Sequence, residues 1–164
     1  MTSPRPSSSG RLPGAEPLYT DVLLDHAQKP RHSERLALPT LSARADNPLC
    51  GDLVELELCV VDGRVAEVSV RVRGCAIATG AGSLAAEVFD GRAVAELAAL
   101  SVAWRVALEV PSLSEPHLPA ALTATRAVLS VRGRPSRRAC ARLVWDALDA
   151  ALAGIAGDMT TALP

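Results

Sequence analysis

Two segments of alternating apolar and polar residues, separated by Asp62-Gly63, give the clearest structural signal in the chain. Every second residue is Val or Leu in residues 54–60, and every second residue is Val in residues 67–72. Successive side chains of a strand point to opposite faces, so each segment predicts a strand with one apolar face. Asp-Gly is a strong signal for a tight turn. The segments therefore predict an antiparallel hairpin whose apolar face needs a cover of helices.

Segments with helical spacing lie on both sides of this hairpin. Apolar residues recur every three or four positions between Pro17 and Pro30, which predicts a short amphipathic helix. Residues 76–89 predict a second helix, and residues 93–100 predict a short third one. A short strand at residues 41–46 is expected to lead into the hairpin.

The C-terminal half continues the helical pattern with interruptions. Residues 102–133 contain three prolines and predict two helical pieces around a proline-containing connection. A further helix is predicted to start at Pro135-Ser136, with Ser136 as its N-cap. One face of this last helix is expected to be buried, and it consists of Cys140, Val144, Ala147, Leu148 and Ala151.

Length and composition restrict the kind of protein. The 164 residues suit one globular domain, and the 49% of hydrophobic residues are mainly aliphatic. Residues 1–16 are rich in Ser, Pro and Gly, so we expect a disordered tail without a secretory signal. The formal net charge of −1 gives no general electrostatic reason to expect nucleic acid or an anionic membrane as a partner. We expect a cytoplasmic protein whose four cysteines are reduced, metal-bound or reactive, with disulfide pairing as the alternative.

The candidate chemistry centres on residues 46–53, where Cys50 and Asp52 lie two positions apart. Residues two apart in an extended chain project to the same side, so both side chains can reach one ion. Gly51 between them is free to adopt the dihedral angles that a close approach requires. This segment therefore predicts half of a metal site.

Cys75 and Cys140 are the candidates for the other half. Cys75 is predicted at a helix N-terminus, where backbone amides and the helix dipole favour a thiolate, although a small buried residue at a strand–helix junction is the alternative. Cys140 lies on a buried helical stripe and can point towards the same loops. Cys59 falls on the glutamate-bearing face of its strand, and we exclude it from the site. Three thiolates and a carboxylate suit a tetrahedral ion, and intracellular sites of this kind most often hold zinc or iron-sulfur clusters.

A series of short motifs follows one another along the chain: Leu18-Tyr19, Asp25-His26, Lys29-Pro30-Arg31, Asn47-Pro48-Leu49-Cys50-Gly51-Asp52, Gly74-Cys75-Ala76-Ile77 and the residues from Arg137 to Trp145. In order and spacing these motifs resemble those of the NifU N-terminal/IscU family. The resemblance extends over about residues 17–153 and leaves residues 154–164 as a C-terminal tail. It implies an α+β domain in which helices cover a three-stranded antiparallel sheet and a metal site lies at one exposed end.

Two features favour the SufU-type branch of this family. IscU-like proteins have His before the last cysteine, with a chaperone-recognition motif upstream, whereas this chain has Ala139 there and arginines upstream. Residues 102–133 look like the insertion of SufU-like members. The resemblance then implies a zinc-dependent sulfurtransferase in which Cys50 accepts persulfide sulfur from a SufS-like cysteine desulfurase and supplies a downstream Suf scaffold. The implied zinc ligands are Cys50, Asp52, Cys75 and Cys140.

Other interpretations of the same residues remain open. An IscU-like scaffold would assemble and transfer a 2Fe-2S cluster on the same ligands, and a third possibility is a purely structural metal in a binding module. Arg137 matches an arginine that SufU-like proteins place near the site, which implies a catalytic role, while a solvated charge is the alternative. Six arginines within residues 126–142 either dock an acidic partner or form a solvated face.

Overall fold

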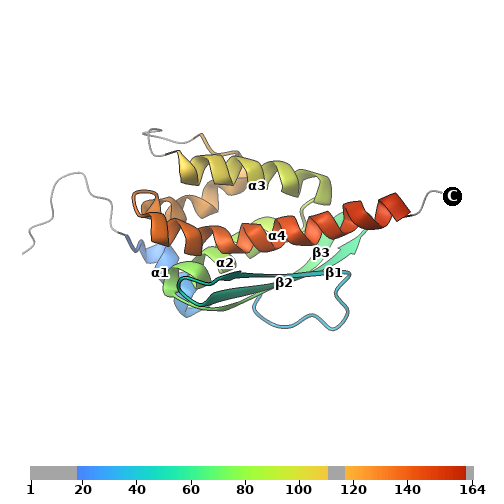
Figure 1. The fold of residues 1–164 in the computed structure, drawn as a ribbon, viewed down its shortest axis with the longest axis horizontal. Helices are drawn as coiled ribbons and strands as arrows, with labels where there is room; N and C mark the ends of the chain where they lie inside the picture. Colours follow the sequence, from blue (N-terminus) through green and yellow to red (C-terminus); the bar gives the residue numbers. More distant parts are fainter. Residues whose placement is uncertain (1–17, 111–116, 162–164) are drawn as a thin grey trace, which may run out of the picture.

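A three-stranded antiparallel sheet, with the strand order β1-β2-β3, forms one layer of the protein, and helices cover one of its faces (Figure 1). The structure, a computed structural model, describes residues 18–110 and 117–161, with side chains described as far as residue 155. The elements in chain order are α1 (Asp21–Gln28), β1 (Leu41–Asn47), β2 (Asp52–Val61), β3 (Arg64–Arg73), α2 (Ala76–Phe89), α3 (Val94–Glu109), the 3-10 helix η1 (Ala120–Val131) and α4 (Pro135–Thr161).

The predicted hairpin is confirmed by strands β2 and β3. Asp62 and Gly63 connect them with φ angles of 50° and 72°, the left-handed conformations that a tight hairpin turn requires. The apolar face is also as predicted, because Val54, Leu56 and Leu58 are completely buried. Strand β1 pairs along the other side of β2 and confirms the predicted short strand before the hairpin.

Helices α2 and α4 provide the apolar cover that the sheet needs. Nearly every residue of α2 is buried, and α4 crosses the sheet next to it (Figure 1). The five residues predicted to form the buried face of the last helix are all buried. Helix α3 lies further from the sheet, and its Trp104 packs with Phe89 of α2 around Trp145 of α4, at ring-centroid distances of 5.9 Å and 5.1 Å from Trp145.

The structure corrects the predicted limits of two helices, α3 and α4. Helix α3 runs to Glu109 instead of ending near Leu100, because Trp104, Ala107 and Leu108 continue its buried stripe. The predicted region of two helical pieces, residues 102–133, contains the end of α3 and the whole of η1, and the connection at residues 111–116 lies outside the described residues.

Ser136 is not the N-cap of the last helix. Helix α4 already begins at Pro135, whose fixed φ angle suits the first helical position. The helix also continues to Thr161, beyond residue 153, where we expected the C-terminal tail to begin. The expected N-terminal tail, residues 1–16, lies outside the described residues. Within the described ranges, no helix combines the length and the apolar composition needed to cross a membrane.

His26 of α1 is buried against α2. Its Nδ1 atom lies 2.8 Å from the Ser83 hydroxyl oxygen, which also accepts a hydrogen bond from the backbone N–H of Arg31. Burial lowers the pKa of His26 below its ordinary value of 6.5, and the charge of Arg31 lowers it further, while Glu87 and Asp25 act in the opposite direction. The folded protein therefore keeps this imidazole neutral.

We expect the melting temperature to decrease as the pH falls below about 6.5, because the unfolded chain then binds a proton at His26 that the folded chain does not. The stability that the neutral His26 contributes is fully present above the pKa that this residue has in the unfolded chain. It is lost as the pH falls through the lower pKa of His26 in the folded protein. His26→Gln can still form a hydrogen bond with Ser83 and should flatten this decrease. Thermal melts of both proteins between about pH 8 and pH 5.5 test this, and parallel curves would show that His26 is not the cause.

Candidate metal centre

The turn between β1 and β2 presents Cys50 to solvent and directs Asp52 inward. The backbone oxygen of Asn47 accepts hydrogen bonds from Gly51 N at 2.8 Å and Cys50 N at 3.3 Å. Leu49 N also donates to the Asn47 side-chain oxygen at 3.1 Å. Gly51 has a φ angle of +73°, which L side chains rarely adopt, so glycine is needed here. Cys50 is exposed as a result, whereas Asp52 is only 3% exposed.

Cys75 is the N-cap residue of α2, which confirms its predicted place at a helix start. Its Sγ accepts a hydrogen bond from Ala78 N at 3.5 Å, and its backbone oxygen accepts from Thr79 N at 3.0 Å. Asp52 binds this residue at two points. Its Oδ1 accepts from Cys75 N at 3.0 Å, and its Oδ2 accepts from the Cys75 thiol at 3.2 Å. The carboxylate therefore joins the start of β2 to the start of α2.

Cys140 reaches the same place from α4. It is only 2% exposed, and its Sγ lies 3.8 Å from Cys50 Sγ and 3.4 Å from the backbone oxygen of Ser136. Residues from a turn, a strand, a helix start and a second helix thus meet at one end of the sheet. The structure brings together Cys50, Asp52, Cys75 and Cys140, the four residues that the resemblance named as ligands.

The spacing of the donor atoms fits a tetrahedral ion. One ligand atom from each of Cys50, Asp52 and Cys140 lies within 4.8 Å of the others, and Cys75 contacts the same carboxylate. Two sulfur atoms bound at about 2.3 Å from a tetrahedral zinc ion are roughly 3.8 Å apart. Because the Cys50 and Cys140 sulfur atoms are 3.8 Å apart, these residues fit a zinc ion with little rearrangement.

The electrostatics of this cluster also favour a cation. Burial raises the pKa of Asp52, but hydrogen bonds from the thiols of Cys140, Cys75 and Cys50 and from the Cys75 amide lower it by more, so the carboxylate stays charged. Burial raises the pKa of the Cys140 thiol, and its contact with the Asp52 carboxylate raises it further. A divalent cation reverses this effect because it stabilises several anionic ligands together.

Gly74 is a residue of the site whose role the sequence did not indicate. A Cβ atom at this position would lie 2.5 Å from Asp52 Oδ1 and 2.7 Å from its Cγ. The lack of a side chain is what allows the carboxylate to lie against the backbone between β3 and α2. The sequence motif contains the Gly74-Cys75 pair. The close approach of the Asp52 carboxylate to Gly74, however, depends on the pairing of β2 with β3.

Gly74→Ala should weaken metal binding and lower stability, since the new methyl group displaces the Asp52 carboxylate. We expect the free energy of unfolding to fall by about 1–3 kcal/mol, the usual cost of overpacking, because the methyl group would overlap the buried Asp52 carboxylate. Gly133→Ala is the matched control, because a Cβ there meets nothing within 4 Å. Zinc content and melting temperature measured for both variants test the prediction, and equal values would show that Gly74 does not hold the carboxylate in place.

The remaining sequence-predicted residues lie around this cluster. Cys59 is half-buried on β2 at a register shift with β3, and it is not among the grouped ligand atoms of the described residues. Arg137 is half-buried about one turn before Cys140, and its side chain makes no hydrogen bond or ion pair to another described residue. All four cysteines are free, so the alternative of disulfide pairing is wrong for this structure.

The fold and the cluster define an α+β domain that gathers cysteine thiolates and a carboxylate at one end of a small antiparallel sheet. The NifU-like N terminal domain matches residues 18–130, and the chain belongs to this family. This agrees with the resemblance and with the predicted three-stranded sheet covered by helices.

Named relatives and a solved structure extend this result. A protein of Archaeoglobus fulgidus named iron-sulfur cluster assembly scaffold protein IscU 1 is 32% identical over 79 residues, which are 48% of this chain and 52% of that protein, so the match spans about half of each. The Bacillus subtilis zinc-dependent sulfurtransferase SufU is 25% identical over 136 residues, 83% of this chain and 90% of that one. The crystal structure of a NifU-like protein (N-terminal) from Brucella abortus has a TM-score of 0.76 and 25% identity, and it covers 85% of this chain and 95% of its own.

Proposed function

We propose that this protein is a zinc-bound sulfur acceptor that takes persulfide sulfur from a cysteine desulfurase for iron-sulfur cluster assembly. The main support is the unequal exposure of the cluster, because Cys50 is exposed on a turn while Asp52 and Cys140 are buried. A partner protein can reach only a thiol that is exposed. The similarity to the zinc-dependent sulfurtransferase SufU supports the same activity.

Cys50, Asp52, Cys75 and Cys140 are the proposed zinc ligands, and bound zinc would keep their thiols deprotonated at neutral pH. In the transfer, the Cys50 thiolate attacks the outer sulfur of the donor persulfide. A new S–S bond forms on Cys50, the S–S bond of the donor breaks, and the donor cysteine leaves as a thiolate. The proton stays on the transferred sulfur, and the exchange requires no external oxidant or reductant.

Arg137 is the residue that we propose to assist this transfer. This residue is half-buried about one helical turn from Cys140, and its side chain has no ion-pair partner among the described residues. A cation in this position can pair with an incoming persulfide or with the thiolate that leaves. The transferred sulfur then passes to a downstream Suf scaffold.

A scaffold that assembles and transfers a 2Fe-2S cluster is the second candidate. It is favoured by the name of the Archaeoglobus relative and by a donor set that would also suit iron. The two candidates differ in the bound metal. Protein purified without oxygen should be colourless and contain about one zinc ion per chain if it is the sulfur acceptor. A brown protein with visible absorption bands and bound iron would instead favour the scaffold.

A further inference from the structure

Five arginines lie within eleven residues around the start of α4, the helix that contains Cys140. Cys140 itself lies between two of them. The first turn of α4 contains no acidic residue. These arginines are Arg132, Arg134, Arg137, Arg138 and Arg142.

Arginines at this position do not stabilise the N-terminus of α4. The N-terminus of an α-helix carries a partial positive charge, so anionic side chains stabilise it and cationic side chains do not. Helix α4 is 27 residues long, the longest in the described part of the chain, and its first turn nevertheless contains Arg137 and Arg138. The stability of the helix itself therefore gives no reason for the two arginines of its first turn.

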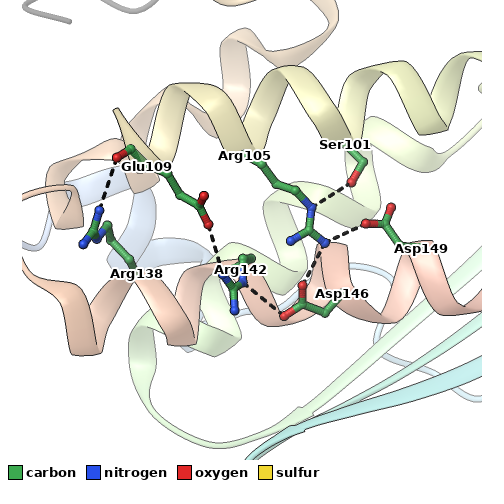
Figure 2. Close-up of polar contacts among 7 residues, drawn as sticks. All are labelled: Ser101, Arg105, Glu109, Arg138, Arg142, Asp146 and Asp149. Atoms are coloured by element: carbon green, nitrogen blue, oxygen red, sulfur yellow. Dashed lines mark hydrogen bonds and ion pairs between the residues drawn. The ribbon is translucent and has the colours of Figure 1, made fainter. Parts of the chain in front are cut away.

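Two of the five arginines are used within the fold. Arg142 forms ion pairs with Glu109 of α3 at 3.0 Å and with Asp146 at 3.3 Å, as Figure 2 shows. Next to this pair, Arg105 joins α3 to two aspartates of α4 (Figure 2). Arg132 donates a hydrogen bond to the backbone oxygen of Val110. These contacts connect α3 and Val110, the residue after it, with α4 and with the end of η1.

The other three form what we call the arginine surface: Arg134, Arg137 and Arg138. Among the described residues, the side chains of Arg134 and Arg137 have no hydrogen-bond or ion-pair partner. Arg138 makes one long bond, 3.4 Å, to the backbone oxygen of Glu109, and its buried Nε has no partner within the described chain. A cleft of about 320 Å³ next to it is lined by Glu109, Pro135, Arg138, Ala139 and Arg142.

On this basis we propose that the arginine surface is the docking site for an acidic surface, rich in Asp and Glu, on the protein that donates sulfur to Cys50. This rests on the proposed function. The Cys50 and Cys140 sulfur atoms are 3.8 Å apart, so a partner bound at the start of α4 is also close to Cys50. Leu49, beside Cys50, is 94% exposed and provides an apolar contact at the same end of the molecule.

A protein surface fits this end better than a nucleic acid. An isolated, fully exposed leucine beside the reactive thiol suits a protein interface, in which apolar contacts lie among charged ones. The net charge of the whole chain is −1, so the positive charge is local and can fix the orientation of an acidic partner.

The test measures binding of the zinc-loaded, full-length protein to a purified cysteine desulfurase at several salt concentrations. The double variant Arg134→Glu/Arg138→Glu should raise the Kd about tenfold or more and reduce its salt dependence. Arg64→Glu is the matched control, because this exposed arginine lies at the hairpin end of β3, away from the cluster, and should leave the Kd unchanged. Arg134→Glu alone should raise the Kd by a smaller factor. This single variant replaces the double variant in the test if the double variant does not fold.

The two proposals can fail separately. At saturating concentration the double variant should stimulate the desulfurase as strongly as wild type, whereas Cys50→Ala should bind with wild-type Kd and not stimulate. A double variant that binds as tightly as wild type, or a wild type that does not bind, would overturn the docking proposal. Tighter binding of a single-stranded RNA oligonucleotide than of the desulfurase, abolished by the double variant, would also overturn it. Loss of stimulation in wild type with intact, salt-dependent binding would contradict only the transfer function.

Discussion

Replacing Cys50 by Ala should leave a folded protein that no longer increases the turnover of a cysteine desulfurase. Cys50 is exposed on a turn and lies 3.8 Å from the buried Cys140 sulfur, so its loss should remove little of the packing that stabilises the fold. It is also the most exposed member of the cluster, because Asp52 and Cys140 are buried and Cys75 is half-buried. We therefore expect stimulation to fall to the background level, measured as sulfide or alanine released from cysteine per unit time.

Cys59→Ala is the control for this experiment. This cysteine is half-buried on β2 and lies outside the grouped ligand atoms, so its removal should leave stimulation unchanged. Circular dichroism of each variant shows whether the fold is kept. Wild-type stimulation by Cys50→Ala would mean that sulfur does not pass through this residue.

Replacing Cys140 by Ser should mainly affect metal binding and folding, in contrast to Cys50→Ala. We expect a large loss of bound zinc and of stability. Its sulfur is almost completely buried, and it connects α4 to the turn that contains Cys50. A serine hydroxyl stays protonated at neutral pH and does not replace a thiolate ligand. We expect zinc affinity to decrease by more than about 100-fold, since even partners of metal ligands contribute 10- to 100-fold.

The measurement is a competition with a chromophoric zinc chelator, combined with thermal melts at fixed zinc concentration. Cys50→Ser is the comparison and should lower the melting temperature much less than Cys140→Ser. If both variants lose equal stability and zinc, the metal has a purely structural role, because the free energy of metal binding then contributes equally to folding from each ligand. That result would favour the third possibility, a binding module with a structural metal.

The alternation of residues 54–72 was sufficient to predict the central hairpin, since the period of two and the Asp-Gly turn depend only on local geometry. Helix limits were harder to predict. Helix α3 extends to Glu109 because Trp104 packs with Trp145 in α4, a contact between segments far apart in sequence. The start of α4 at Pro135 also depends on a choice between two local solutions, proline at the first position or serine as the cap.

The candidate site was predictable in its residue types but not in its geometry. Spacing placed Cys50 with Asp52, and the strand–helix junction placed Cys75 at a helix N-terminus, as observed. The 3.8 Å approach of Cys140 to Cys50 depends on how α4 crosses the sheet. The contact of Gly74 with Asp52 similarly requires the register of β2 and β3, which pairs Leu53 with Arg73.

The most direct test of the account is to find where the transferred sulfur is attached. The zinc-loaded protein is incubated with a cysteine desulfurase and cysteine, its free thiols are blocked, and its peptides are analysed by mass spectrometry. We predict that the peptide with Cys50 gains the mass of one sulfur atom and that the peptide with Cys59 does not. Absence of added sulfur from Cys50 under conditions in which the desulfurase itself forms a persulfide would contradict the proposed function.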